Sequence, residues 1–108
     1  MTKQEEKIGQ LQMYEQSLQN ILLQKQQFQS QLSEIDSALK EMESSSETYR
    51  IVGNIMVLTK KEELKKELQE KNSSLKLRIK TLEKQEDTIK EKAQSLQSDI
   101  MKGMEKND

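Results

Sequence analysis

Tyr49-Arg-Ile-Val-Gly-Asn-Ile-Met-Val-Leu-Thr-Lys60 is an apolar stretch between two long segments rich in Gln, Glu, Lys and Ser. β-branched residues lie on both sides of Gly53-Asn54, and this dipeptide is a turn signal for a β-hairpin. The flanking segments repeat apolar residues with helical spacing. We therefore predict a mainly α fold: a long antiparallel two-helix coiled coil with a central β-hairpin over residues 49–58.

The predicted hairpin has no polar face. If residues 52–55 form the turn, the opposed pairs are Val52–Ile55, Ile51–Met56, Arg50–Val57 and Tyr49–Leu58. Opposed residues share a face of the ribbon, so both faces are mostly apolar, and both edges are unpaired. We expect the hairpin to join an intersubunit β-barrel through Tyr49, Ile51, Val52, Ile55, Met56, Val57 and Leu58. The alternative is a loop that rests on the helix ends, which the apolar density disfavours.

Residues 4–43 carry five consecutive heptads. One seam position holds Leu11, Leu18, Lys25, Leu32 and Leu39, and the other holds Tyr14, Ile21, Phe28, Ile35 and Met42. This repeat predicts a coiled-coil helix. Ser44-Ser45-Ser46 should end it, because serine has low helix propensity and competes for backbone hydrogen bonds.

A second helix is expected over residues 60–104, so that residues 1–108 would form one unit. Its start resembles a capping box, Thr59-Lys-Lys-Glu62. Its seam positions hold Leu68, Leu75, Leu82, Ile89 and Leu96 on one line, and Asn72, Ile79, Glu86, Ala93 and Ile100 on the other. Leu64 lies one residue out of this phase, which predicts a local distortion of the first turns.

The two seams match when the chain folds back at the hairpin. Pairing residues whose numbers sum to about 103 places six apolar layers in register. Lys25 then lies nearest Arg78 and Ile79, so an ion pair with Glu86 is not expected. The polar seam residues Lys25, Asn72 and Glu86 are interpreted as setting register rather than as functional. A parallel dimer through each helix separately is the alternative, which the short connection disfavours.

Composition excludes most chemistry. The 108 residues include no His and no Cys, so the usual zinc ligands, disulfides and a general base titrating near neutrality are absent. Eighteen basic and 19 acidic residues give a net charge of -1, which is no footprint for nucleic acid. No apolar segment is long enough for a signal peptide or membrane span. We expect a protein that is not an enzyme, needs no cofactor or metal, and is located in the cytoplasm.

Several large apolar residues lie off the seam. In the antiparallel arrangement most of them gather in the half that carries both termini. A cluster of this kind indicates an interaction site, and methionine adapts to partners of varied shape. The residues expected to form this interaction site are Ile8, Met13, Leu22, Leu23, Met101 and Met104. Contact with a neighbouring helix, or fraying, is the alternative.

The chain resembles the β-type subunits of the prefoldin family, most closely those of archaea. Tyr49-Arg-Ile-Val-Gly-Asn-Ile-Met-Val-Leu58 is similar to the family segment Tyr-Lys-x-x-Gly-Asn-Ile-Leu-Ile/Val. The similarity continues through residues 61–71 and Leu82-Glu-Lys-Gln-Glu86, and upstream through Gln24-Lys-Gln26 and residues 38–42.

The resemblance implies a hexamer of two α and four β subunits whose hairpins pool into β-barrels. It also implies an ATP-independent chaperone that holds unfolded polypeptides at the coiled-coil tips and transfers them to a group II chaperonin. Two other functions remain open. One is a structural coiled-coil tether that oligomerises through its hairpin, and the other is a helical protein associated with nucleic acid.

Overall fold

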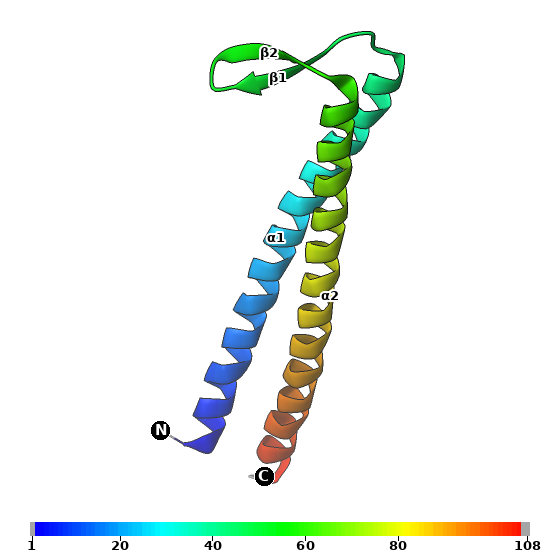
Figure 1. The fold of residues 1–108 in the computed structure, drawn as a ribbon. Coiled ribbons are helices and arrows are strands. Elements are labelled where there is room, and N and C mark those ends of the chain that lie inside the picture. Colours follow the sequence, from blue (N-terminus) through cyan, green and yellow to red (C-terminus); the bar gives the residue numbers. More distant parts are fainter. Residues whose placement is uncertain (1, 107–108) are drawn as a thin grey trace. The chain divides into compact units, whose positions relative to one another are not determined.

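The computed structural model describes residues 2–106, with side chains through Met104. The element order is α1 (Lys3–Ser44), β1 (Thr48–Val52), β2 (Ile55–Thr59) and α2 (Lys61–Lys106) (Figure 1). The predicted mainly α fold with a central hairpin is therefore confirmed. Met1 and residues 107–108 of the predicted unit lie outside the described residues.

Two compact units divide the chain. Unit 1 consists of residues 1–26 and 80–108, and unit 2 consists of residues 27–79, which include the hairpin. Each unit contains a segment of α1 paired with an antiparallel segment of α2. The assignment of residues 1–108 to a single unit stays a prediction.

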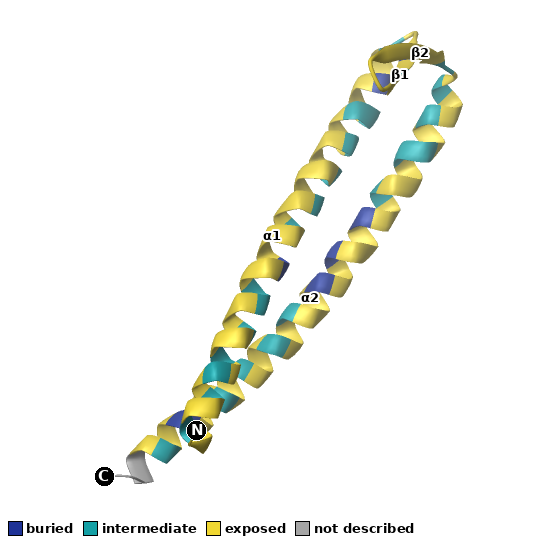
Figure 2. Cartoon of the chain, turned by 90° about the vertical axis from the view of Figure 1, so that its left-hand side faces the viewer, coloured by how far each residue is buried: buried dark blue, intermediate teal, exposed yellow. Residues whose placement is uncertain are grey.

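The heptad seam forms the core of each unit. The ribbon segments coloured as buried or intermediate lie on the facing sides of the helices, and the outer sides are exposed (Figure 2). In unit 1 the buried apolar residues are Ile21, Leu82 and Ile100, and in unit 2 they are Met42, Leu75 and Ile79. All six occupy predicted seam positions, so the repeat identified the core correctly.

Around Phe28 and Asp36, residues of α1 meet residues of α2 that lie three to five positions farther from the hairpin than predicted. Arg78 lies over the ring of Phe28, with its Cζ 5.8 Å from the centroid. Asn72 Nδ2 donates to Asp36 Oδ1 at 2.7 Å. These pairs sum to 106 and 108 rather than 103. Long side chains reach about one helical turn along the axis, so a seam pattern tolerates such an offset.

One seam prediction was wrong. Lys25 Nζ lies 3.5 Å from Glu86 Oε1, within unit 1, and both side chains are only 16% exposed. Lys90 also approaches the same oxygen at 3.7 Å. The offset brings Glu86 within reach of the flexible Lys25 side chain, which the predicted register excluded.

The predicted cap of α2 does not form. Thr59 belongs to β2, and its hydroxyl donates to the Val57 carbonyl at 3.2 Å instead of capping the helix. A similar motif does occur at α1, where Thr2 Oγ1 accepts from the Glu5 amide at 3.2 Å. Thr59 is still paired with Thr48 in the hairpin. The helix therefore begins at Lys61, one residue later than the start at residue 60 that a capping box at Thr59 predicts.

The hairpin has the predicted register. Val52 faces Ile55, and the pairing continues to Thr48–Thr59. Gly53 has a φ of +62°, and no other residue that the structure describes has a positive φ. A single positive φ at the first central residue is typical of a type II′ turn.

Candidate functional site: two exposed apolar surfaces

The hairpin surface consists of the seven predicted assembly residues. Every one of them is exposed, over a range of 45% to 72%. A single chain therefore leaves both faces of the ribbon open to water, which a two-stranded ribbon alone does not tolerate well. The members are Tyr49, Ile51, Val52, Ile55, Met56, Val57 and Leu58.

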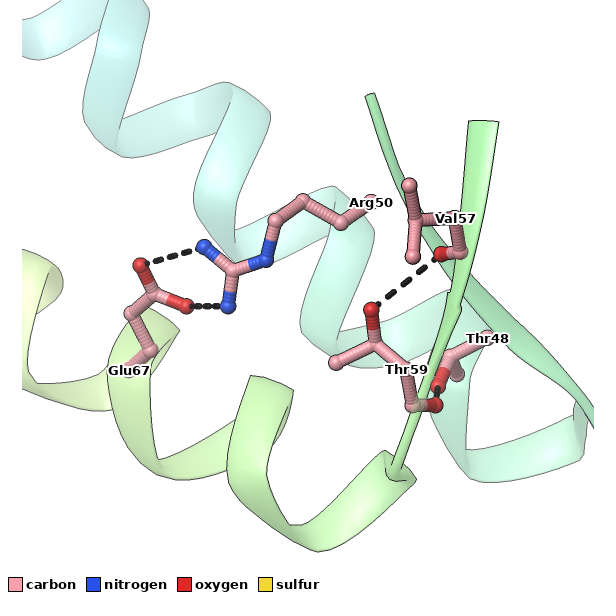
Figure 3. A network of polar contacts seen from close by, with 5 residues as sticks. All are labelled: Thr48, Arg50, Val57, Thr59 and Glu67. Atoms are coloured by element: carbon pink, nitrogen blue, oxygen red, sulfur yellow. Dashed lines mark hydrogen bonds and ion pairs between the residues drawn. The ribbon is translucent and has the colours of Figure 1, made fainter. Parts of the chain in front are cut away.

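An ion pair ties the hairpin to α2. Arg50 donates to both carboxylate oxygens of Glu67, with Nη1 2.9 Å from Oε1 (Figure 3). These hydrogen bonds, with the arginine charge, hold the pKa of Glu67 below its ordinary value, although desolvation opposes the shift. The same contact raises the pKa of Arg50. A bidentate pair fixes direction as well as distance, so it orients β1 against the first turns of α2.

The base of the hairpin is also fixed by hydrogen bonds. Thr48 is buried, and its hydroxyl donates to the Thr59 carbonyl at 2.7 Å (Figure 3). Lys61 Nζ donates to the Ser45 carbonyl at 3.0 Å, which links the start of α2 to the segment after α1. The Tyr49 hydroxyl donates to Glu47 Oε2 at 2.6 Å, and this bond raises the pKa of Tyr49. These contacts hold the base of the hairpin in place while the apolar side chains of the hairpin surface stay exposed.

The second candidate surface, here called the client set, lies wholly in unit 1. Its members are 42% to 68% exposed. Ile8, Met13, Leu22 and Leu23 are on α1, and Met101 and Met104 are on α2.

The client set is spread along the helices rather than gathered in one patch. Fourteen residues separate Ile8 from Leu22, which is about 21 Å along a helix. Leu22 and Leu23 therefore lie near the Lys25–Glu86 pair, and Ile8 lies near the start of α1.

Both surfaces consist of apolar side chains. Among the described residues, no group of three acidic, His or Cys side chains could hold a metal ion. In the same part of the chain, no helix is both long and apolar enough to cross a bilayer. What the arrangement offers is two sets of exposed apolar side chains on paired helices and a hairpin.

This combination defines a class of proteins with two long paired helices and a β-hairpin between them. The family description "Prefoldin subunit" matches residues 5–107, and the chain belongs to that family. Prefoldin subunits are chaperones rather than enzymes. Assembly with other prefoldin subunits follows from family membership.

Relatives in sequence and a solved structure also belong to the prefoldin family. The prefoldin subunit beta of Pyrococcus abyssi is 40% identical over 96 residues, covering 86% of this chain and 82% of the relative. That of Archaeoglobus fulgidus is 39% identical over 88 residues, covering 79% and 76%. The crystal structure of the prefoldin beta subunit from Thermococcus strain KS-1 superposes with a TM-score of 0.86 at 36% identity, covering 95% of this chain and 93% of that one.

Sequence reasoning missed two positioning contacts. Arg50 was placed on a hairpin face, but its partner Glu67 was not identified, because a separation of 17 residues follows no helix or strand period. Gln4 Nε2 donates to the Ile100 carbonyl at 2.7 Å. Gln4 lies seven residues before Leu11, so extending the heptads by one step would have placed it on the seam.

Proposed function

We propose that this chain is the β-type subunit of an ATP-independent holdase, which captures unfolded polypeptides on the client set and transfers them to a group II chaperonin. The observation that carries the proposal is the exposure of six large apolar side chains in unit 1 of a prefoldin-family chain. The proposed setting is the cytoplasm, in an α2β4 hexamer with an α-type partner and other β copies.

The chemistry of the client set suits unfolded chains. Such chains expose apolar segments without a common shape, and flexible Met and Leu side chains can adapt to them. Each CH₂ group removed from water contributes up to about 0.8 kcal/mol. Contacts from a few such residues are weak, so a client can be released to a stronger acceptor without ATP.

Assembly converts weak contacts into retention. The hairpin surface would pool with hairpins of other subunits into a β-barrel, where both its faces are covered. Several client sets on one scaffold then act together, because the first contact raises the effective concentration for the next. Retention therefore depends on both surfaces.

Simultaneous change of Met13, Leu22, Met101 and Met104 to Ser should abolish suppression of client aggregation. The variant changes four of the six residues of the client set and leaves the hairpin sequence intact. Light scattering of a diluted, denatured client reports protection, and sedimentation reports assembly. The protein is tested as the complex reconstituted with its α-type partner.

Leu77→Ser is the matched control, since Leu77 is also exposed and apolar but belongs to unit 2. It should retain protection. Normal assembly of the quadruple variant with undiminished protection would rule the proposal out, and would favour a structural tether that oligomerises through its hairpin.

A further inference from the structure

In unit 1, the first turns of α1 and the last turns of α2 have few apolar residues at their seam positions. Seven residues before Leu11, the seam position holds Gln4, and the next seam position holds Lys7. On α2, Ile100 is buried, but the following seam position is Gly103. Helix ends with few apolar contacts fray readily. The pairing of these turns therefore needs another source of stabilisation.

A hydrogen bond between the helices supplies it. Gln4 Nε2 donates to the Ile100 backbone carbonyl at 2.7 Å, in a partly buried position. A carbonyl oxygen has two lone pairs, so it can accept from Gln4 in addition to a helical amide. This contact joins residues 96 positions apart, and it ties the first turn of α1 to the last turns of α2.

Gly103 makes room for the Gln4 amide. A Cβ placed at Gly103 would lie 2.7 Å from Gln4 Oε1 and 3.3 Å from its Cδ and Nε2. The backbone of Gly103 does not itself call for glycine, because its φ is not positive. Glycine inside a helix lowers helix stability. The missing side chain is therefore used to seat the amide against α2.

We propose that Gln4 and Gly103 form a latch that positions part of the client set; this inference rests on the proposed function. Ile8 lies one turn after Gln4, and Met101 follows Ile100, whose carbonyl accepts from Gln4. Met104 follows Gly103, which leaves the space that the Gln4 amide occupies. With the latch closed, apolar side chains from both helices face a client segment together. Fixing them beforehand reduces the ordering cost of binding.

Gly103→Ala tests the latch, with Gly9→Ala as its matched control. Both substitutions replace a helical glycine with alanine and raise helix propensity. A Cβ at Gly9 meets no atom within 4 Å, whereas one at Gly103 displaces the Gln4 amide. The readouts, on the assembled complex, are amide hydrogen exchange at residues 96–104 and protection against aggregation of reduced insulin.

Gly9→Ala should leave both readouts unchanged. Gly103→Ala should speed exchange in the last turns and raise the amount of complex needed for half protection about two- to tenfold, the loss expected for one hydrogen bond. Gln4→Ala alone should cause at least as large a loss, because it removes the same hydrogen bond without the gain in helix propensity. Adding Gly103→Ala to Gln4→Ala should cause no further loss, because the group that Cβ would displace is gone.

The latch is overturned if Gly103→Ala exchanges like Gly9→Ala. Its positioning role is overturned if the turns open while protection stays unchanged. Failure of the client set itself is seen separately, as full protection by the quadruple serine variant.

Discussion

Lys25 and Glu86 form a charged pair at the coiled-coil seam, with both side chains only 16% exposed. Removing charges from water is costly, so a buried ion pair is often no more stable than apolar residues of similar size. Removing one partner is worse, because the other charge stays buried. Glu86 keeps Lys90 at 3.7 Å, whereas Lys25 has no second carboxylate partner among the described residues. Replacing Glu86 and replacing Lys25 should therefore change the free energy of unfolding by different amounts.

Glu86→Met should lower the free energy of unfolding by about 1–3 kcal/mol, since it leaves the Lys25 ammonium without its acceptor. Lys25→Met should cost less, because Lys90 still neutralises Glu86. The double change to Met should be neutral or stabilising by up to about 4 kcal/mol. Urea denaturation followed by circular dichroism, at one protein concentration, measures all three. A double variant less stable than both single variants would contradict this interpretation.

At the scale of elements, α1 and α2 owe their stability to a narrow seam. Neither helix has a broad apolar face, and the outer sides are exposed (Figure 2). A buried seam residue should therefore matter far more than an equally apolar residue outside it. Leu82 and Leu23 permit the comparison, because both are leucines in unit 1, with exposures of 8% and 58%.

Leu82→Ala should lower the free energy of unfolding by about 2–5 kcal/mol through lost burial and the cavity left behind. Leu23→Ala should change it by less than about 0.5 kcal/mol. Thermal melting of the assembled protein provides the test. Equal melting temperatures for the two variants would show that Leu82 is not a seam residue.

At the scale of the whole molecule, a single chain leaves the apolar residues of its hairpin exposed to water. Hydrogen bonds at its base and the Arg50–Glu67 pair hold the ribbon in place, but they cover none of the hairpin surface. Exposed apolar ribbons with open edges pair with other strands. The complete protein is therefore expected to be an assembly.

Replacing Ile55 and Val57 with Asp should produce smaller species while keeping most of the helix content, because both side chains are exposed in the single chain. Charges on a ribbon face that becomes buried by assembly oppose that burial. Sedimentation measures the mass, and circular dichroism measures the helix content. Gln69→Asp with Ser73→Asp, at exposed positions of α2, controls for the added charge. An unchanged mass for the hairpin variant would contradict a role in assembly.

The amino-acid sequence by itself determined the two helices, their seam and the hairpin register. These features follow local periods: 3.5 residues for the seam of a coiled coil and two for a strand. Gly53 added the turn, because it accepts a positive φ without steric cost. Exposed positions such as Met13 and Met101 followed from the same periods, since a residue off the seam faces outward.

Only the tertiary structure decided which residues meet across the helices. The pattern of Leu and Ile repeats every heptad, so a shift of about one turn keeps apolar residues opposite one another and costs the pattern nothing. Because of this shift, Lys25 forms an ion pair with Glu86, although the predicted register placed it beside Arg78. The Gln4–Ile100 bond joins residues whose numbers sum to 104, close to the predicted register, but it depends on the space left by Gly103. Contacts between residues distant in sequence follow no local period, so the packing of the two helices sets them.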